Sequence, residues 1–227
     1  MKNIPFTERC RPARLDDIVM TVKNRRLLEP QLSGAKDIQN MVFHGKSGCG
    51  KTTAARLFGS LPRLADRVMS INASKDLVTR QDLSQITEFL NRQGNGLADA
   101  LESGSSPYRL VVLEEADELT PRMVAAFRGY IEDNYGKGRF ILTMNSLKKM
   151  TPALISRFKM VDFSVAGLDA TPEFASHIDR ISKLLAKTGM KLDRATIDEI
   201  CRSNFPDFRK MESEVESASL PVAPRGA

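Results

Sequence analysis

Short apolar runs with the length of β-strands recur along the first two thirds of the chain. The run LVVL at residues 110–113 is too apolar to have a solvated face, as is typical of a strand inside a parallel sheet. Between the runs, apolar residues recur at helical spacing, as at positions 119, 123, 127 and 131. Strands that alternate with helices predict an α/β fold with a five-stranded parallel sheet covered on both faces. The five predicted strands are residues 41–44, 68–71, 110–113, 140–143 and 160–164.

The pattern changes after Gly167, where the strands stop. Apolar residues at helical spacing predict three further helices, at residues 174–187, 193–203 and 206–217. Together they predict a small all-helical lid domain. We therefore expect an α/β domain over residues 1–166, a helical lid over 167–218 and a flexible tail over 219–227.

Charge is spread unevenly along the 227 residues. The chain has 34 Lys and Arg against 28 Asp and Glu, but residues 167–227 hold nine basic and ten acidic residues. The basic excess in the first 166 residues fits contact with a phosphate backbone, or simply a solubilising surface. No apolar run approaches the ~20 residues of a membrane span, and the N-terminus lacks the apolar region of a signal peptide. Three scattered cysteines fit a reducing cytoplasm, which we expect to be the host's if the protein is viral.

A glycine-rich motif follows the first predicted strand. Residues 45–52, GKSGCGKT, fit the phosphate-binding pattern G-x-x-x-x-G-K-[ST] at every position. Backbone N–H groups of such a loop surround phosphates, Lys51 reaches the β- and γ-phosphates, and the Thr52 hydroxyl can hold Mg²⁺. The alternative is a glycine-rich turn that binds nothing. The expected phosphate-binding residues are Gly45, Gly48, Cys49, Gly50, Lys51, Thr52 and Thr53.

Carboxylates end the third predicted strand, in the run LVVLEEAD at residues 110–117. We expect Glu114 to hold Mg²⁺ and Glu115 to polarise an attacking water. The alternative is a solvated acidic turn. Asn145, after the fourth strand, either orients water near the γ-phosphate or is a turn residue.

Two arginines have two interpretations each. Arg157 follows a serine and is either a surface residue or an arginine finger that acts on a neighbour's phosphate. Arg209 can supply charge to a phosphate from the predicted lid, or it can pair with Asp207.

The motifs, in this order, resemble those of the AAA+ clamp-loader ATPases, a family that includes the small subunits of replication factor C. Within this family, the closer resemblance is to the ATPase subunit of the T-even-type bacteriophage clamp loader, above all in NFPDFRK at residues 204–210. The resemblance covers roughly residues 4–218. Besides the P-loop it rests on ERCRP at 8–12 with LDDIV at 15–19, NASKD at 72–76, and PALISRF at 152–158.

The resemblance implies a role for each matching residue. ATP and Mg²⁺ are the expected cofactors, with Asn145 as sensor 1 and Arg209 as sensor 2. Arg157, and Arg128 with it, would reach the ATP site of the next subunit. The helix with Ile86, Phe89 and Leu90 meets the sliding clamp or packs in the core, and Lys75 and Arg80 would track the template backbone. The residues that would line the adenine pocket are Thr7, Glu8, Arg9, Cys10 and Val19.

The expected function is that of an ATP-hydrolysing subunit that opens a sliding clamp and places it on primer–template DNA. Its partners would be that DNA, the clamp and other loader subunits in a hetero-oligomeric ring, with no membrane. The alternatives are an AAA+ ATPase with another DNA task, such as helicase loading, and a nucleotide-binding assembly subunit with little hydrolysis. The sequence departs from the family in three residues and one domain. Glu114 replaces Asp, Cys10 an aromatic residue and Phe158 a cysteine. The sequence leaves no room for the helical collar that the resemblance implies after the lid, so we expect either a fragment or a collar on a separate chain.

Overall fold

The computed structural model describes residues 4–76, 83–92, 108–165 and 167–219, and the chain forms two compact units. We call Val22–Lys46 with Lys51–Phe163 the sheet unit. Met1–Thr21, Ser47–Gly50 and Ser164–Ala227 form the helical unit. The expected division after residue 166 lies close to the start of the last segment. It does not anticipate that residues 1–21 and 47–50 group with the C-terminal helices.

The sheet unit contains a five-stranded sheet in the order β2-β3-β4-β1-β5, and every strand pair in it is parallel. The α/β fold class expected from the sequence is therefore confirmed. Because all strands run the same way, their carboxyl ends share one edge, where Glu114 ends β3 and Glu115 and Asn145 follow β3 and β4. The strands are β1 (Met41–His44), β2 (Val68–Asn72), β3 (Arg109–Glu114), β4 (Gly138–Met144) and β5 (Lys159–Asp162).

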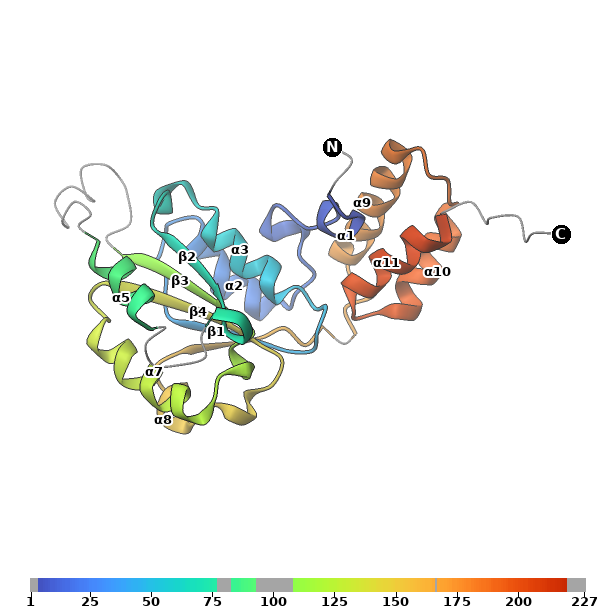
Figure 1. Ribbon diagram of the computed structural model, residues 1–227. Coiled ribbons are helices and arrows are strands. Elements are labelled where there is room, and N and C mark those ends of the chain that lie inside the picture. Colours follow the sequence, from blue (N-terminus) through green and yellow to red (C-terminus); the bar gives the residue numbers. More distant parts are fainter. Residues whose placement is uncertain (1–3, 77–82, 93–107, 166, 220–227) are drawn as a thin grey trace. The chain divides into compact units, whose positions relative to one another are not determined.

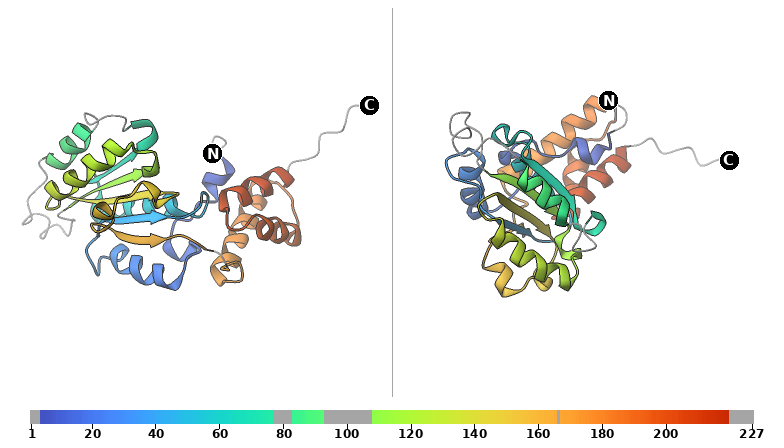
Figure 2. Two further views of the ribbon diagram at one scale, coloured as in Figure 1. Left: turned by 90° about the horizontal axis from the view of Figure 1, so that it is seen from below. Right: turned by 60° about the vertical axis from the view of Figure 1, so that its left-hand side comes forward.

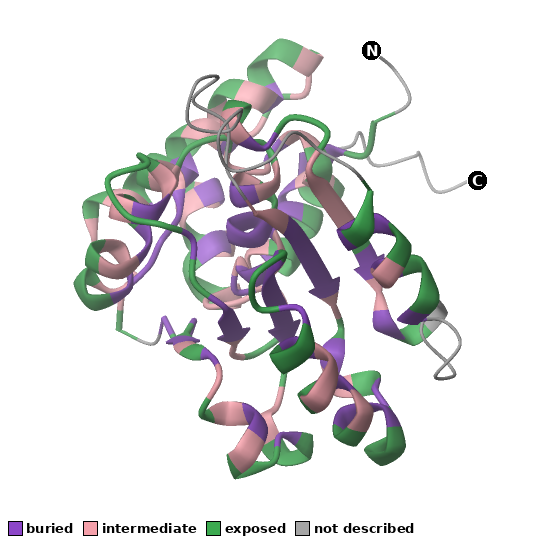
Figure 3. Ribbon diagram, turned by 90° about the vertical axis from the view of Figure 1, so that its left-hand side faces the viewer, coloured by how far each residue is buried: buried purple, intermediate pink, exposed green. Residues whose placement is uncertain are grey.

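Helices cover both faces of this sheet, because successive strand residues point to opposite sides. On one side, Val42 of β1 belongs to an apolar cluster with residues of α5 (Leu83–Asn91) and α7 (Pro121–Asp133). On the other side, the next residue, Phe43, contacts Phe58 of α3 (Lys51–Gly59). Figure 2 shows α2 on one side of the strands and α5 and α7 on the other. The inner strands β3, β4 and β1 are almost entirely buried (Figure 3), as expected for a parallel sheet covered twice, whereas the edge strands β2 and β5 each have one buried residue.

One helix of the sheet unit, α2 (Val22–Leu32), precedes the first strand in the chain, and the others alternate with the strands (Figure 1). The sequence analysis did not predict α2, which has few apolar residues and contains Pro30, a residue that disfavours helix interiors. The unit also has three-residue 3-10 helices, of which η4 (Ala116–Glu118) follows β3 and η5 (Leu147–Lys149) follows β4. The α-helices are α2 (Val22–Leu32), α3 (Lys51–Gly59), α4 (Ala73–Asp76), α5 (Leu83–Asn91), α7 (Pro121–Asp133) and α8 (Pro152–Ile155).

The helical unit is built on α9, α10 and α11, which match the three helices expected after Gly167. Their N-terminal ends have local caps, since Thr171 and Asp193 accept hydrogen bonds from the first turns of α9 and α10. No helix in the described part of the chain is both long and apolar enough to cross a bilayer. The bounds are α1 (Phe6–Arg9), η1 (Leu15–Asp17), α9 (Pro172–Thr188), α10 (Arg194–Asn204) and α11 (Phe208–Ser219), which ends one residue beyond the expected lid.

Candidate nucleotide site

Lys51 opens α3 and is buried, with 8% of the residue exposed. Its Nζ donates to the carbonyl oxygens of Gly45 at 2.8 Å and Lys46 at 2.7 Å, and to Oδ1 of Asn145 at 3.0 Å. An ammonium group has three N–H donors, so these three acceptors are enough to use all of them. A phosphate oxygen that binds Lys51 must therefore replace or share one of these acceptors.

Asn145 is held in place by a second partner, Asp117 of η4. The backbone N–H of Asn145 donates to Asp117 Oδ1 at 3.1 Å, and its Nδ2 lies 3.4 Å from Asp117 Oδ2. Thus the structure brings together Lys51 and Asn145, two residues that the sequence analysis singled out separately. The structure adds Asp117, to which that analysis gave no role although the residue ends the acidic run at residues 110–117.

Glu115 lies between β3 and η4 in the left-handed backbone region, with φ 56° and ψ 39°. A residue with a Cβ is uncommon there, and such conformations are found disproportionately at functional sites. Its Oε2 lies 2.9 Å from the hydroxyl oxygen of Ser74, which also lies 2.7 Å from Asn72 Oδ1. Because a serine hydroxyl has one hydrogen, Ser74 can bond fully to only one of these acceptors at a time.

Glu114, the expected magnesium ligand, ends β3 and forms an ion pair with Arg56 of α3 at 3.6 Å. Among the described residues, no three His, Cys, Asp or Glu side chains cluster as a metal site. Magnesium sites in proteins usually combine one or two protein oxygens with substrate phosphates and water. The Thr52 hydroxyl and the Glu114 carboxylate are oxygen donors of the kind that fits Mg²⁺.

Arg157, the candidate arginine finger, forms an ion pair with Glu132 of α7 and donates to the carbonyl oxygen of Ala153. Its Nη1 also lies 3.3 Å from the hydroxyl of Ser156. The side chain is 26% exposed, so it is neither a fully solvated surface arginine nor buried. Any action on a neighbouring subunit requires Arg157 to leave Glu132.

Gly48 of the glycine-rich loop lies against the predicted lid motif, within the helical unit. Its carbonyl oxygen accepts from the backbone N–H of Phe208 at 3.1 Å. Its φ is +75°, and a Cβ at this position would overlap the carboxylate of Asp207, so glycine is required there. Asp207 Oδ1 accepts from the N–H of Lys210 at 3.0 Å and so caps α11, in whose first turn Arg209 is exposed.

The residues expected near adenine also lie in the helical unit. Thr7, Glu8 and Arg9 belong to α1, whereas Cys10 and Val19 are buried in an apolar cluster with residues of α9, α10 and α11. Burial raises the pKa of the Cys10 thiol well above its ordinary value. Contact of these five residues with a nucleotide base stays a prediction.

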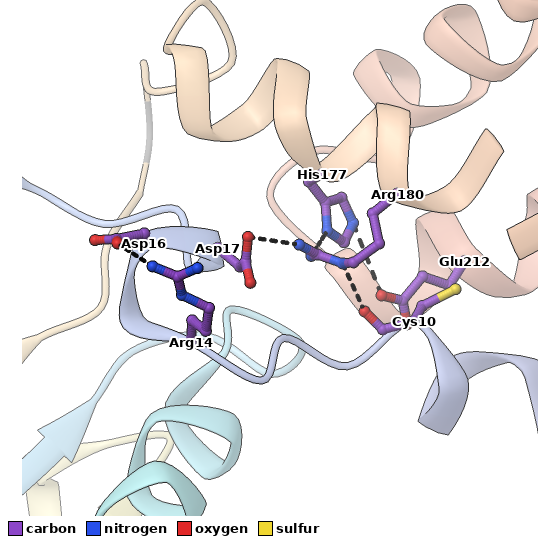
Figure 4. A network of polar contacts seen from close by, with 7 residues as sticks. All are labelled: Cys10, Arg14, Asp16, Asp17, His177, Arg180 and Glu212. Atoms are coloured by element: carbon purple, nitrogen blue, oxygen red, sulfur yellow. Dashed lines mark hydrogen bonds and ion pairs between the residues drawn. The ribbon is translucent and has the colours of Figure 1, made fainter. Parts of the chain in front are cut away.

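A buried polar network joins the segment after α1 to α9 and α11 (Figure 4). Arg180 donates to the Cys10 carbonyl oxygen at 3.1 Å and lies 3.6 Å from Asp17 Oδ1. Its Nη2 is 2.7 Å from Nδ1 of His177. Because a guanidinium can only donate, Nδ1 accepts and the ring proton sits on Nε2, 3.7 Å from Glu212 Oε1. That N–H is buried, and none of the described residues offers it a hydrogen-bond acceptor within reach.

Burial sets the protonation of this network. It raises the pKa of Glu212 to about 8, against the opposing effect of the Arg180 charge. It also lowers the pKa of His177 to about 3, and there the Arg180 charge acts in the same direction. Both side chains are therefore neutral at pH 7. The sequence carries one signal for this network, a histidine and an arginine three residues apart on a helix that is otherwise apolar on that side.

The remaining residues from the sequence analysis are those expected to contact the clamp, the DNA or a neighbouring subunit. Some of them lie outside the described residues. Ile86, Phe89 and Leu90 are buried in the core of the sheet unit, which is the core-packing alternative. The side chain of Lys75 and all of Arg80 lie outside the described residues, as does the tail over 220–227. Arg128 is exposed on α7.

Comparisons with known proteins find a family model, related sequences and similar folds. A family model described as "ATPase family associated with various cellular activities (AAA)" matches residues 41–164, more than half of the chain. The chain is 31% identical over 223 residues to replication factor C subunit 4 of Caenorhabditis elegans, covering 95% of this chain and 63% of that protein. It is 31% identical to replication factor C subunit 5 of Arabidopsis thaliana, covering 96% and 57% respectively.

Both relatives are longer proteins, and this chain spans less than two thirds of either. Among solved structures, the Thermotoga maritima RuvB Holliday junction branch migration motor is similar, with a TM-score of 0.64. The alignment covers 92% of this chain and 64% of that chain at 17% identity, which supports the shared fold alone.

Proposed function

This chain belongs to the AAA ATPase family, and on that premise we propose that it is an ATP-hydrolysing subunit of a DNA sliding-clamp loader. The observation that carries the proposal is the similarity to replication factor C subunits over 95–96% of this chain, which includes the sheet and the C-terminal helices. Because the chain spans only part of those relatives, its DNA, clamp and subunit partners belong to the proposal.

The glycine-rich loop and Lys51 would hold the ATP phosphates. Backbone N–H groups of residues 45–53 supply the cradle, and Lys51 supplies the charge once it exchanges one of its present acceptors. In the proposed site, the base lies against residues 7–10 and Val19. Arg209 adds a second positive charge from the first turn of α11.

Hydrolysis would use the residues at the carboxyl ends of β3 and β4. Thr52 and Glu114 would hold Mg²⁺, which would supply positive charge against the phosphate oxygens. Glu115 accepts a proton from the attacking water, and Asn145 orients that water toward the γ-phosphate. Glu114 ends β3, Glu115 and Asn145 follow β3 and β4, and Thr52 lies at the start of the helix after β1, so all four belong to the carboxyl edge of the sheet.

Ring assembly completes the proposal. Arg157, with Arg128, acts on the ATP of the next subunit, and primer–template DNA and a clamp bind the assembled ring. The closer likeness to the T-even-type bacteriophage subunit is part of this proposal and is supported by residues 204–210. The relatives named above are eukaryotic.

ATP turnover by the chain with its partner subunits tests the proposal. Turnover is measured with and without clamp and primed DNA, and Lys51→Ala serves as the inactive control. A clamp-loader subunit is expected to respond to both additions and most strongly to the two together. A turnover that neither addition changes would contradict the clamp-loader function and would favour an AAA+ ATPase with another task.

The ion pair between Arg56 and Glu114 favours a second function, a nucleotide-binding assembly subunit with little hydrolysis. A carboxylate that stays paired with an arginine is a poorer magnesium ligand. Glu114→Asp shortens the side chain and is expected to preserve or raise turnover if Glu114 serves hydrolysis. A wild-type complex that binds ATP tightly, hydrolyses it slowly and gains turnover when Arg56→Ala releases Glu114 would support the assembly role.

A further inference from the structure

The amide group of Asn145 lies between two partners of opposite polarity. On one side is the ammonium of Lys51, 3.0 Å from Oδ1, and on the other is the carboxylate of Asp117, 3.4 Å from Nδ2. An ammonium only donates and an ionised carboxylate only accepts. The two charges therefore allow only one of the two amide orientations that differ by a 180° flip.

Asp117 also fixes the backbone at the same residue. Its Oδ1 accepts from the Asn145 backbone N–H at 3.1 Å, so one carboxylate binds both the main chain and the side chain of Asn145. Asp117 is placed for this by η4, which begins immediately after Glu115 at the end of β3. Because β3 and β4 are neighbours in the sheet, η4 lies beside the carboxyl end of β4.

We propose that Asp117 is a positioning residue for ATP hydrolysis, which orients the Asn145 amide and, through it, the ammonium of Lys51. This inference rests on the proposed function. Asp117 does not itself touch the nucleotide in this account. It acts by keeping Oδ1 of Asn145 toward Lys51 and by leaving the second Nδ2 hydrogen free to donate to water or phosphate.

Asp117→Asn separates this role from simple support of the backbone. The oxygen of the introduced amide still accepts from the Asn145 N–H, so a purely structural role survives. Its NH₂ group then faces Nδ2 of Asn145, donor to donor. If Asn145 flips to relieve that contact, its Nδ2 faces Lys51, so either orientation weakens the bond between Lys51 and Asn145.

The experiment measures kcat and KM for ATP in the full complex with clamp and primed DNA. Asp117→Asn is expected to lower kcat by about 10- to 100-fold and to change KM by less than about threefold, since the loop and Lys51 still bind phosphate. In an Asn145→Ala background, Asp117→Asn is expected to add less than about a twofold loss. The matched control is Glu118→Gln, which removes an exposed carboxylate from the same 3-10 helix and should leave kcat unchanged.

A wild-type kcat for Asp117→Asn would overturn the proposal. So would a double variant whose loss of kcat equals the product of the losses in Asp117→Asn and Asn145→Ala alone. Failure of the proposed function looks different, because the wild-type complex itself would then show no stimulated turnover. In that case hydrogen exchange at the Asn145 backbone amide of the isolated chain tests the contact. It should be about tenfold faster in Asp117→Ala and unchanged in Asp117→Asn, and an unchanged rate in Asp117→Ala would refute the geometry.

Discussion

Glu212 and His177 should give the helical unit an unusual dependence of stability on pH. Both residues are buried, at 6% and 2% exposure, and they face each other across 3.7 Å. The pKa of Glu212 rises from an ordinary 4.5 to about 8, and that of His177 falls from an ordinary 6.5 to about 3. Over a wide pH range, Glu212 is therefore protonated in the folded chain but ionised in the unfolded chain. His177 is neutral in the folded chain at pH values where the unfolded chain protonates it.

The sign follows from which state binds more protons. Between pH 4.5 and 8 the folded chain holds the Glu212 proton and the unfolded chain does not, so Glu212 lowers the unfolding free energy as pH rises. Between pH 6.5 and 3 the unfolded chain protonates His177 and the folded chain does not, so His177 lowers the unfolding free energy as pH falls. Each group contributes a slope of about 1.4 kcal/mol per pH unit.

The two slopes cancel between pH 4.5 and 6.5, where stability from this pair should be flat. From pH 6.5 to 8 only Glu212 acts, and the unfolding free energy should fall by roughly 2 kcal/mol. The other charges around Glu212 oppose one another. Arg180, Arg11 and Arg209 favour its ionised form, whereas Glu8 disfavours it.

Urea unfolding followed by circular dichroism, at pH values from 5.5 to 8.5, measures this directly. Glu212→Gln keeps the size and shape of the side chain but cannot ionise. The difference in unfolding free energy between Glu212→Gln and wild type should therefore grow by roughly 2 kcal/mol from pH 6.5 to 8. Glu214→Gln, at an exposed position on the same helix, is the matched control and should show no such change. A Glu212→Gln chain with the pH dependence of the wild type would show that Glu212 is ionised in the fold and would refute the argument.

Three further predictions concern ATP. Lys51→Ala should abolish or greatly weaken ATP binding without unfolding the chain, and wild-type affinity in an equilibrium binding assay would contradict the assignment of residues 45–52 as a phosphate loop. Glu115→Gln should still bind ATP but turn it over at least about 100-fold more slowly in a steady-state assay, because the variant cannot accept the water proton. Arg157→Ala should bind ATP normally as an isolated chain but lose about 1,000-fold or more of the stimulated turnover in the complex, which mixing with Lys51→Ala should partly restore. An Arg157→Ala complex that hydrolyses ATP at the wild-type rate with clamp and primed DNA would rule out the ring arrangement.

Glu132→Gln serves as a control for the experiment with Arg157→Ala. Glu132→Gln removes the charge that binds Arg157 in the structure but leaves the arginine itself. If Arg157 leaves Glu132 to act on a neighbour, Glu132→Gln should retain stimulated turnover, in contrast to Arg157→Ala. Equal losses in the two variants would mean that the ion pair itself, and not the free arginine, supports turnover.

The sequence by itself determined the local features of this protein. Runs of apolar residues identified all five strands within about two residues, because a buried strand must be apolar over its own length. The glycine spacing of residues 45–52 identified the phosphate loop, since that chemistry depends on neighbours in the chain. The sequence did not predict the helix α2, because Pro30 and a mostly polar composition leave little helical signal there.

The tertiary structure alone decided which of these features meet. The order β2-β3-β4-β1-β5 places the residues after β3 beside those after β4, so that Asp117 reaches Asn145 and Asn145 reaches Lys51, 94 positions away in the chain. It likewise gave Arg157 its partner Glu132, and gave the segment around Cys10 its contact with Arg180. Periodicity and motif spacing describe only residues close in the chain. Contacts between strand ends and between distant helices depend on how the elements pack, which no local pattern specifies.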